Sequence, residues 1–179
     1  MRRISSQPSR PLGPKPGRLV SPLSPEVAVT ILNRQRRKRV DLALLRRITL
    51  ALLGDLGLES AELGIHLVAA RQMAQVNWRY LRHEGSTDVI TFNHDAGDGA
   101  EPGSDRQLYG ELFVCVDDAA KQAGEFQTTW RSEIVRYVVH GVLHLLGHDD
   151  LEAGPRRKMK RAENRLVRRL EAAFPVSKL

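Results

Sequence analysis

The chain has 179 residues, of which 41% are hydrophobic, and this is enough for one folded domain with its own core. Its net charge of +7 is unevenly distributed, because residues 1–47 carry +10, residues 48–151 carry −9 and residues 152–179 carry +6. The single cysteine excludes an internal disulfide. No apolar run reaches the roughly 18–20 residues of a membrane span, and no apolar segment follows the basic N-terminus as in a secretory signal. Together these features indicate a cytoplasmic protein without a membrane partner.

The first part of the chain predicts a basic arm, one strand and one helix. Residues 1–24 hold five prolines among Ser, Gly and Arg residues, a composition typical of a disordered arm. The β-branched run at 27–32 favours a strand. Asp41 is a candidate N-cap for a helix over 42–53, where apolar residues recur at helical spacing before two glycines.

The middle of the chain predicts three further strands, one helix and one long loop. We expect the strands at 62–69, 88–92 and 108–116 and the helix at 71–81. The segment 93–106 is rich in Gly, Asp and Pro and predicts an exposed loop.

The last part of the chain predicts three helices. A short one is expected from Asp117 to about Gly124, because two acidic residues favour a helix N-terminus. A long helix from about 128 to 146 is apolar nearly all round and is therefore expected to be buried, and a basic helix follows over 151–174. Four strands and about five helices that do not strictly alternate predict an α+β domain, with a mixed sheet of about four strands packed against the helices.

Two histidines near the end of the long helix form the most informative pattern. His140 and His144 are four residues apart, which on an α-helix places both imidazoles on one face. Gly147 can end the helix in a left-handed turn, after which Asp150 can bring an oxygen towards the same place. Such a His-x3-His-x5-Asp set is typical of catalytic zinc, which keeps one coordination position open. The alternative is a helix whose histidines have ordinary polar partners, but a buried helix makes this explanation harder.

These motifs resemble those of the YbeY family of metal-dependent endoribonucleases, which are also described as rRNA maturation factors. That family carries H-G-x-L-H-L-x-G-Y-D-H, and residues 140–150 stand in the same register. It also carries N-x-x-Y/F before T-D-V-L-S-F, matched here by Asn77, Tyr80 and residues 87–92. Its G-D-I-V-I strand is matched loosely by residues 110–114.

The resemblance implies a zinc-dependent endoribonuclease that acts on single-strand-type RNA in ribosomal RNA processing. It covers roughly residues 25–155, which would form the endoribonuclease domain with one zinc ion. The basic arm over 1–24 and the basic helix and tail over 156–179 lie outside its most diagnostic motifs. Ribosomal RNA or ribosomal subunits would be the partners, and the basic ends of the chain would hold the RNA backbone. Basic tails that only keep a protein soluble explain the charge equally well.

The chain departs from the family pattern at two places. The third zinc ligand of the family is usually histidine, whereas Asp150 stands at that position. A carboxylate is a competent zinc ligand, and Asp150 keeps the register, but His148 is a rival third ligand. The family often has an arginine after the tyrosine, thought to serve the active site. Leu81 stands there, and Arg82, one residue later, is the candidate catalytic substitute or else an ordinary loop arginine.

Two other classes of function remain open from the sequence. Zinc peptidases of the H-E-x-x-H type place a glutamate base after the first histidine, where this chain has Gly141, so a peptidase-like hydrolase would need a base from elsewhere. A non-catalytic assembly factor that binds ribosomal RNA is the other alternative. Asp88 and Asp149 are candidates for orienting a ligand imidazole or transferring a proton, and either could instead cap a turn.

Overall fold

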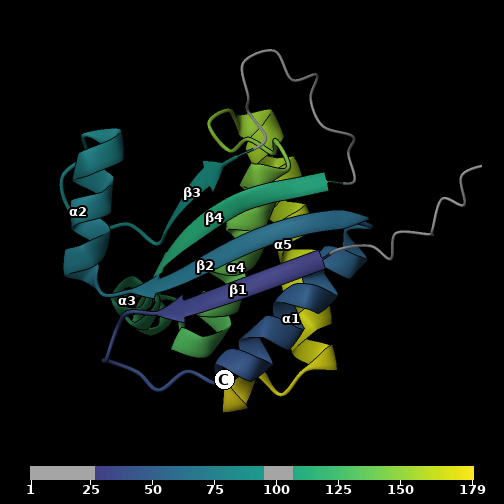
Figure 1. Ribbon diagram of the computed structural model, residues 1–179, viewed down its shortest axis with the longest axis horizontal. Helices are drawn as coiled ribbons and strands as arrows, with labels where there is room; N and C mark the ends of the chain where they lie inside the picture. The colour runs from purple at the N-terminus through teal and green to yellow at the C-terminus, as the bar shows by residue number, and fades with distance from the viewer. Residues whose placement is uncertain (1–26, 95–106) are drawn as a thin grey trace, which may run out of the picture.

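A four-stranded sheet forms the centre of the computed structural model, which describes residues 27–94 and 107–179 (Figure 1). The strands lie in the order β1-β2-β4-β3. Their bounds are Val27–Asn33 for β1, Ser60–Val68 for β2, Val89–Asn93 for β3 and Gln107–Cys115 for β4. β1, β2 and β4 are parallel and β3 is antiparallel, so the sheet is mixed. The expected arm over 1–24 and most of the expected loop over 93–106 lie outside the described residues.

Helices cover one face of this sheet, and one helix packs near the end of the other face (Figure 1). The helices are α1 Leu42–Asp55, α2 Ala70–Leu81, α3 Val116–Phe126, α4 Trp130–Leu145 and α5 Ala153–Ala173, followed by the short 3-10 helix η1 Val176–Lys178. The prediction of a single α+β domain with a four-stranded mixed sheet and five helices is therefore confirmed. In the described part of the chain, no helix combines the length and the apolar character that a membrane crossing requires.

Local sequence accounts for several element boundaries. The Asp41 side chain accepts a hydrogen bond from the Leu44 amide at 2.9 Å, as expected of an N-cap. The helix that it begins was expected to stop before Gly54, but it continues through Asp55. Gly57 has a φ of +72°, a conformation that glycine adopts more cheaply than other residues, and the chain turns there into β2.

Helix α4 is the buried centre of the helical layer. Its residues Ile134, Val138 and Val142, spaced four apart, are all essentially inaccessible to solvent. Gly141 lets the helix approach the sheet, because a Cβ atom there would lie only 2.7 Å from a methyl carbon of Leu112. Helix α5 packs against α4 and contributes to the same core through Met159, Leu166, Val167 and Leu170. The C-terminal segment 156–179 thus shares the core of the preceding residues.

Candidate metal centre

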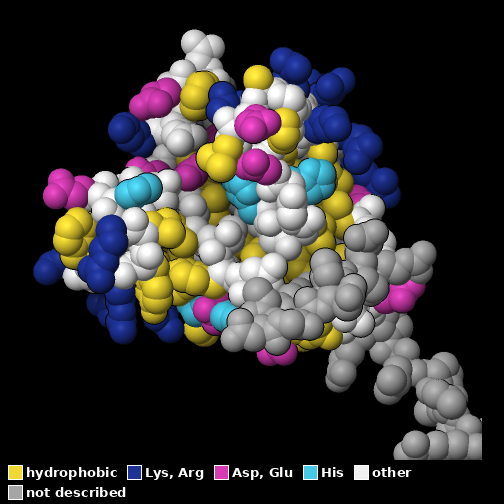
Figure 2. All heavy atoms as spheres, turned by 90° about the horizontal axis from the view of Figure 1, so that it is seen from above, with side chains coloured by type: hydrophobic (Ala, Val, Ile, Leu, Met, Phe, Trp, Pro, Cys, Tyr) yellow, Lys and Arg dark blue, Asp and Glu magenta, His cyan; other side chains and the backbone are white. Residues whose placement is uncertain are grey.

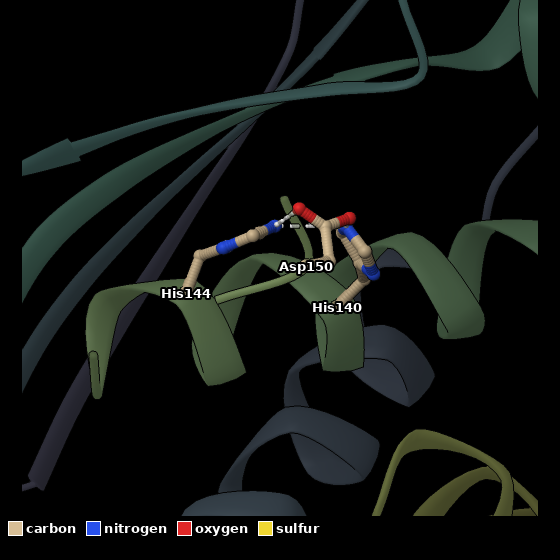
Figure 3. A group of neighbouring side chains, drawn as sticks. All are labelled: His140, His144 and Asp150. Atoms are coloured by element: carbon tan, nitrogen blue, oxygen red, sulfur yellow. Dashed lines mark hydrogen bonds and ion pairs between the residues drawn. The ribbon is translucent and has the colours of Figure 1, made fainter. Parts of the chain in front are cut away.

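The C-terminal end of α4 presents His140 and His144 on one face, and the following loop brings Asp150 back to them (Figure 3). The turn depends on Gly147, whose φ is +81°. The Gly147 amide donates to the carbonyl of His144, and the next amide donates to the carbonyl of Leu143 at 3.0 Å. As a result, one ligand atom from each of His140, His144 and Asp150 lies within 4.8 Å of the other two.

The hydrogen-bond partners of the two imidazoles indicate which nitrogens face the centre. His144 Nδ1 lies 3.0 Å from the carbonyl oxygen of His148, which can only accept, so this nitrogen donates. His140 Nδ1 lies 3.0 Å from a carboxylate oxygen of Glu163 and donates in the same way. In the neutral rings both Nε2 atoms then carry lone pairs, and they lie 3.0 Å apart.

This arrangement fits a small cation with nitrogen and oxygen ligands. The two oxygens of the Asp150 carboxylate face one imidazole each, with Oδ2 3.8 Å from His140 Nε2 and Oδ1 3.8 Å from His144 Nε2. Two ligands on a tetrahedral zinc ion, at about 2.0–2.1 Å from the metal, are separated by about 3.4 Å. The three observed separations bracket that value, and two lone pairs and an anionic oxygen that converge are electrostatically suited to a positive charge. His140, His144 and Asp150 are thus the described residues that could hold a metal ion.

Glu163 supports the centre from α5. The side chain is buried, with only 2% of the residue exposed, and besides His140 it accepts hydrogen bonds from Arg136 at 2.6 Å and from Lys160 at 2.9 Å. Burial alone would raise the pKa of Glu163, but the hydrogen bonds from His140, Lys160 and Arg136 outweigh it and lower the pKa to about 2. The carboxylate is therefore ionised at neutral pH and fixes the His140 ring, as a partner behind a metal-binding imidazole does.

A cleft of about 440 Å³ opens beside His140 on the side of α5. Its charged lining residues carry both signs. The cationic ones are Arg136, Arg156 and Lys160, and the acidic ones are Asp88, Asp150 and Glu163. Figure 2 looks onto this end of the molecule, where Lys and Arg side chains gather along one side of the central histidines. Cationic side chains thus line the same cleft as two of the residues that could hold a metal ion.

Two further residues that line this cleft are Arg156, which holds a loop, and Tyr137, whose hydroxyl is buried. Arg156 donates to the carbonyl oxygens of Asp150 at 2.7 Å and of Leu151 at 2.9 Å, which holds the loop that carries the aspartate. Tyr137 is buried at the cleft wall, and burial, followed by the charges of Asp88 and other nearby carboxylates, raises the pKa of its hydroxyl. The phenol therefore stays protonated at neutral pH.

The other residues that the sequence singled out lie apart from the three converging side chains. His148 is exposed and only its backbone carbonyl contacts the site, so Asp150, rather than this rival, belongs to the group. Arg82 is exposed at the end of α2, with a φ of 58°, and does not line the cleft beside His140. Asp149 accepts from the Leu151 amide at 2.9 Å and so caps a turn.

Asp88 takes the capping role, which was one of the two roles that the sequence left open for it. Its carboxylate accepts from the Thr87 hydroxyl and from the Val89 amide, both at 2.9 Å, and thereby caps the start of β3. It also lines the cleft. Glu163, by contrast, was not singled out from the sequence. The available signal was its place on the apolar stripe of a basic helix, between Met159 and Leu166, where a lone acid calls for a buried partner.

Comparisons with known proteins agree with this fold and with the sequence motifs. A family model described as endoribonuclease YbeY matches residues 30–171. Endoribonuclease YbeY from Chlorobium luteolum is 31% identical over 140 residues, which cover 78% of this chain and 96% of that protein. Its namesake from Syntrophotalea carbinolica is 32% identical over 151 residues, which cover 82% and 97%.

A solved structure shows the same fold. The solution structure of TM1509 from Thermotoga maritima has a TM-score of 0.58 to this chain at 23% identity, and the match covers 82% of this chain and 91% of that one. The family model spans most of the present sequence, and the relatives are matched over nearly their full length. The chain therefore belongs to the endoribonuclease YbeY family.

Proposed function

We propose that this protein is a zinc-dependent endoribonuclease that hydrolyses single-strand-type RNA in the cytoplasm during ribosomal RNA processing. The observation that carries the proposal is the convergence of His140, His144 and Asp150 beside a cleft with cationic side chains. Membership of the family supports the reaction class. In this proposal residues 25–155 supply the three ligands of one zinc ion, and the basic segments 1–24 and 156–179 assist RNA binding, the second of them also carrying Glu163 behind His140.

The three converging side chains would hold the metal, and their neighbours would keep them in place. Zinc supplies Lewis acidity, which activates a water molecule near neutral pH and stabilises negative charge on a phosphoryl group. Glu163 orients the His140 ring, and the His148 carbonyl orients the His144 ring. Three protein ligands leave room for water or substrate, as catalytic zinc requires.

Cationic side chains near the centre would bind the phosphodiester. Lys160 lines the cleft with 59% of its side chain exposed, so its ammonium group can reach a bound phosphate while it stays close to Glu163. Arg156 lines the same cleft. Because a guanidinium group has five donors and Arg156 uses two of its nitrogens on loop carbonyls, it retains donors for a phosphate oxygen. Arg82 remains a predicted catalytic residue on sequence grounds alone.

The peptidase alternative is weakened by the position after the first histidine. Gly141 has no side chain, and a Cβ atom there would point at Leu112 and Val89 in the core. A glutamate at this position would therefore face the sheet rather than the metal centre, and no base of the H-E-x-x-H type is available.

The proposal is tested first by the metal content of untagged protein. We expect about one zinc per chain in the wild type, loss in His144→Ala and strong reduction in Asp150→Ala, because each substitution removes a ligand. His148→Ala is the matched control, and it should retain the metal since its imidazole lies outside the group. Loss of zinc in His148→Ala with retention in Asp150→Ala would overturn the ligand set.

Cleavage of ribosomal RNA precursors by the same variants separates catalysis from scaffolding. We expect His144→Ala and Asp150→Ala to lose cleavage while they keep the circular dichroism spectrum of the wild type, and His148→Ala to cleave normally. A folded Asp150→Ala variant that lacks zinc and still cleaves RNA would refute a metal-dependent nuclease. Zinc-loaded wild type that binds ribosomal RNA without cleaving it would instead favour the non-catalytic assembly factor.

A further inference from the structure

The outward face of α5 carries a stripe of arginines that begins at Arg157, the residue after Arg156 of the cleft. Arg157, Arg161, Arg165 and Arg168 are all exposed, and their spacing of four, four and three residues aligns them on one side of the helix. The opposite side of α5 is buried against α4. Over eleven residues, at 1.5 Å per residue, this α5 arginine stripe is about 16–17 Å long.

Like charges stand close together along the stripe, and this arrangement contributes nothing to the packing of the helix. Arg157 and Arg161, and then Arg161 and Arg165, are like charges four residues apart, an arrangement that costs an isolated helix a few tenths of a kcal/mol per pair. In the described part of the chain, no carboxylate lies within ion-pair distance of the four arginines. The neighbouring cations differ, because Arg169 pairs with Asp55 at 2.7 Å and Lys160 pairs with Glu163.

The position of the stripe relates it to the proposed reaction. Helix α5 starts directly after the loop that carries Asp150, and Arg156 at its first turn binds that loop. From there the helix runs alongside α4, away from the C-terminal end of α4 (Figure 1). A polyanion laid along the stripe would therefore have one end beside the cleft at His140.

We propose that the α5 arginine stripe is a binding track for the RNA backbone, which holds the strand on one side of the cleaved bond. This inference rests on the proposed function, because the metal centre at one end of the track identifies a phosphodiester polymer as the occupant. Arginine binds phosphate by charge and by paired hydrogen bonds and reads no base sequence, so the track positions the strand without selecting it. Each phosphate bound releases counterions, which makes the contribution measurable as a salt dependence.

The test measures binding of a fluorescein-labelled oligodeoxyuridine to the full, zinc-loaded chain by anisotropy over a range of salt concentrations. This DNA strand presents the same phosphate backbone to the track, and no chelator is needed to prevent cleavage of RNA. The variant replaces the four stripe arginines by glutamine, a good helix former. The matched control replaces four exposed arginines elsewhere, Arg34, Arg36, Arg71 and Arg79, with the same change in net charge.

We expect the slope of log K against log salt to become shallower by about 3 in the stripe variant, since each phosphate contact on a single strand contributes about 0.7. The control should change the slope by less than half as much. A milder variant, Arg161→Gln with Arg165→Gln, should change it by about 1.4. Equal losses in the stripe variant and the control, or an unchanged slope in the stripe variant, would overturn the track.

Cleavage assays keep this inference separate from the proposed function. The stripe variant should raise KM for RNA and leave kcat unchanged, because the metal centre is intact. Asp150→Ala should lose cleavage and keep the wild-type salt slope. If Asp150→Ala still cleaves, the proposed function fails while the slope still reports on the track. If kcat falls in the stripe variant with KM unchanged, the track fails while the nuclease assignment stands.

Discussion

Glu163 links two helices through a single buried carboxylate. Its oxygens accept from His140 on α4, from Arg136 on α4 and from Lys160 on its own helix. One oxygen therefore fixes the proton on His140 Nδ1, which leaves the Nε2 lone pair towards the metal centre, while the other oxygen is held by cations. The effect of this residue should be visible in metal affinity and in acid stability.

Replacing Glu163 by glutamine should weaken zinc binding about 10- to 100-fold, the usual effect of losing a carboxylate behind a ligand imidazole. Glutamine keeps the size of the side chain but removes its charge, so the His140 ring becomes a weaker ligand. Competition with a chromogenic chelator measures the affinity. Glu171→Gln, at an exposed position of the same helix, is the control. Equal zinc affinity of Glu163→Gln and wild type would show that the carboxylate does not act on the centre.

The same carboxylate should make the metal-free protein sensitive to acid. Its pKa is about 2 in the folded state against an ordinary value of 4.5, so the ionised form is favoured by folding. The stabilisation, on the order of 3 kcal/mol, is fully present above pH 5 and is lost as the pH falls towards 2, with about 2 kcal/mol lost by pH 3. Urea unfolding at pH 7 and pH 3 should therefore show that the free energy of unfolding falls more in the wild type than in Glu163→Gln. If the free energy of unfolding fell equally in both proteins, the acid sensitivity could not be assigned to Glu163.

At the scale of elements, α4, which carries two of the three candidate metal ligands, packs very closely on the sheet. Two glycines permit the approach from opposite sides. Gly141 lies on the helix over Leu112, and Gly110 lies on β4 beneath Leu145. The two positions differ in what surrounds them, because the first faces only side-chain methyl groups whereas the second also faces a backbone oxygen.

Gly110→Ala should destabilise the protein more than Gly141→Ala. A Cβ at residue 110 would lie 2.7 Å from the Phe92 carbonyl oxygen, which cannot move without disturbing β3, so we expect a loss of about 3 kcal/mol or more. At residue 141 the overpacking cost of about 1–3 kcal/mol is partly offset by about 1 kcal/mol of helix propensity. Urea unfolding measures both, with Gly54→Ala as a control that should stabilise since nothing lies within 4 Å. A larger loss of stability in Gly141→Ala than in Gly110→Ala would refute this explanation.

The elements also show which features could be predicted from the sequence. The apolar pattern of α4 and the capping residue Asp41 are local signals, and both specified their helices. The turn at Gly147 was predictable because a left-handed residue favours glycine, and it brought Asp150 back to the histidines. Glu163 was not predictable in this way, since its contact with His140 spans 23 residues and depends on how α5 packs on α4. Local periodicity carries no information on that packing.

At the scale of the whole molecule, Cys115 reports on the integrity of the fold. It is fully buried at the end of β4, in a small cluster with Val68, Met73 and Ile90. Burial, with a further contribution from Asp118, raises the pKa of the Cys115 thiol to about 12. Because the thiolate is the reactive form, the native protein should resist alkylation near pH 8, and reaction should require opening of the structure.

Iodoacetamide labelling of Cys115 should therefore slow when zinc binds at the C-terminal end of α4. A ligand that binds only the folded state, at 100 times its dissociation constant, stabilises that state by about 2.7 kcal/mol, which lowers the open population about 100-fold. If labelling follows global opening, its rate should fall by up to the same factor. Asp150→Ala should show no such protection, because it lacks a ligand. Rapid labelling of the folded wild type, or equal protection in Asp150→Ala, would show that the thiol and the metal centre do not belong to one cooperative unit.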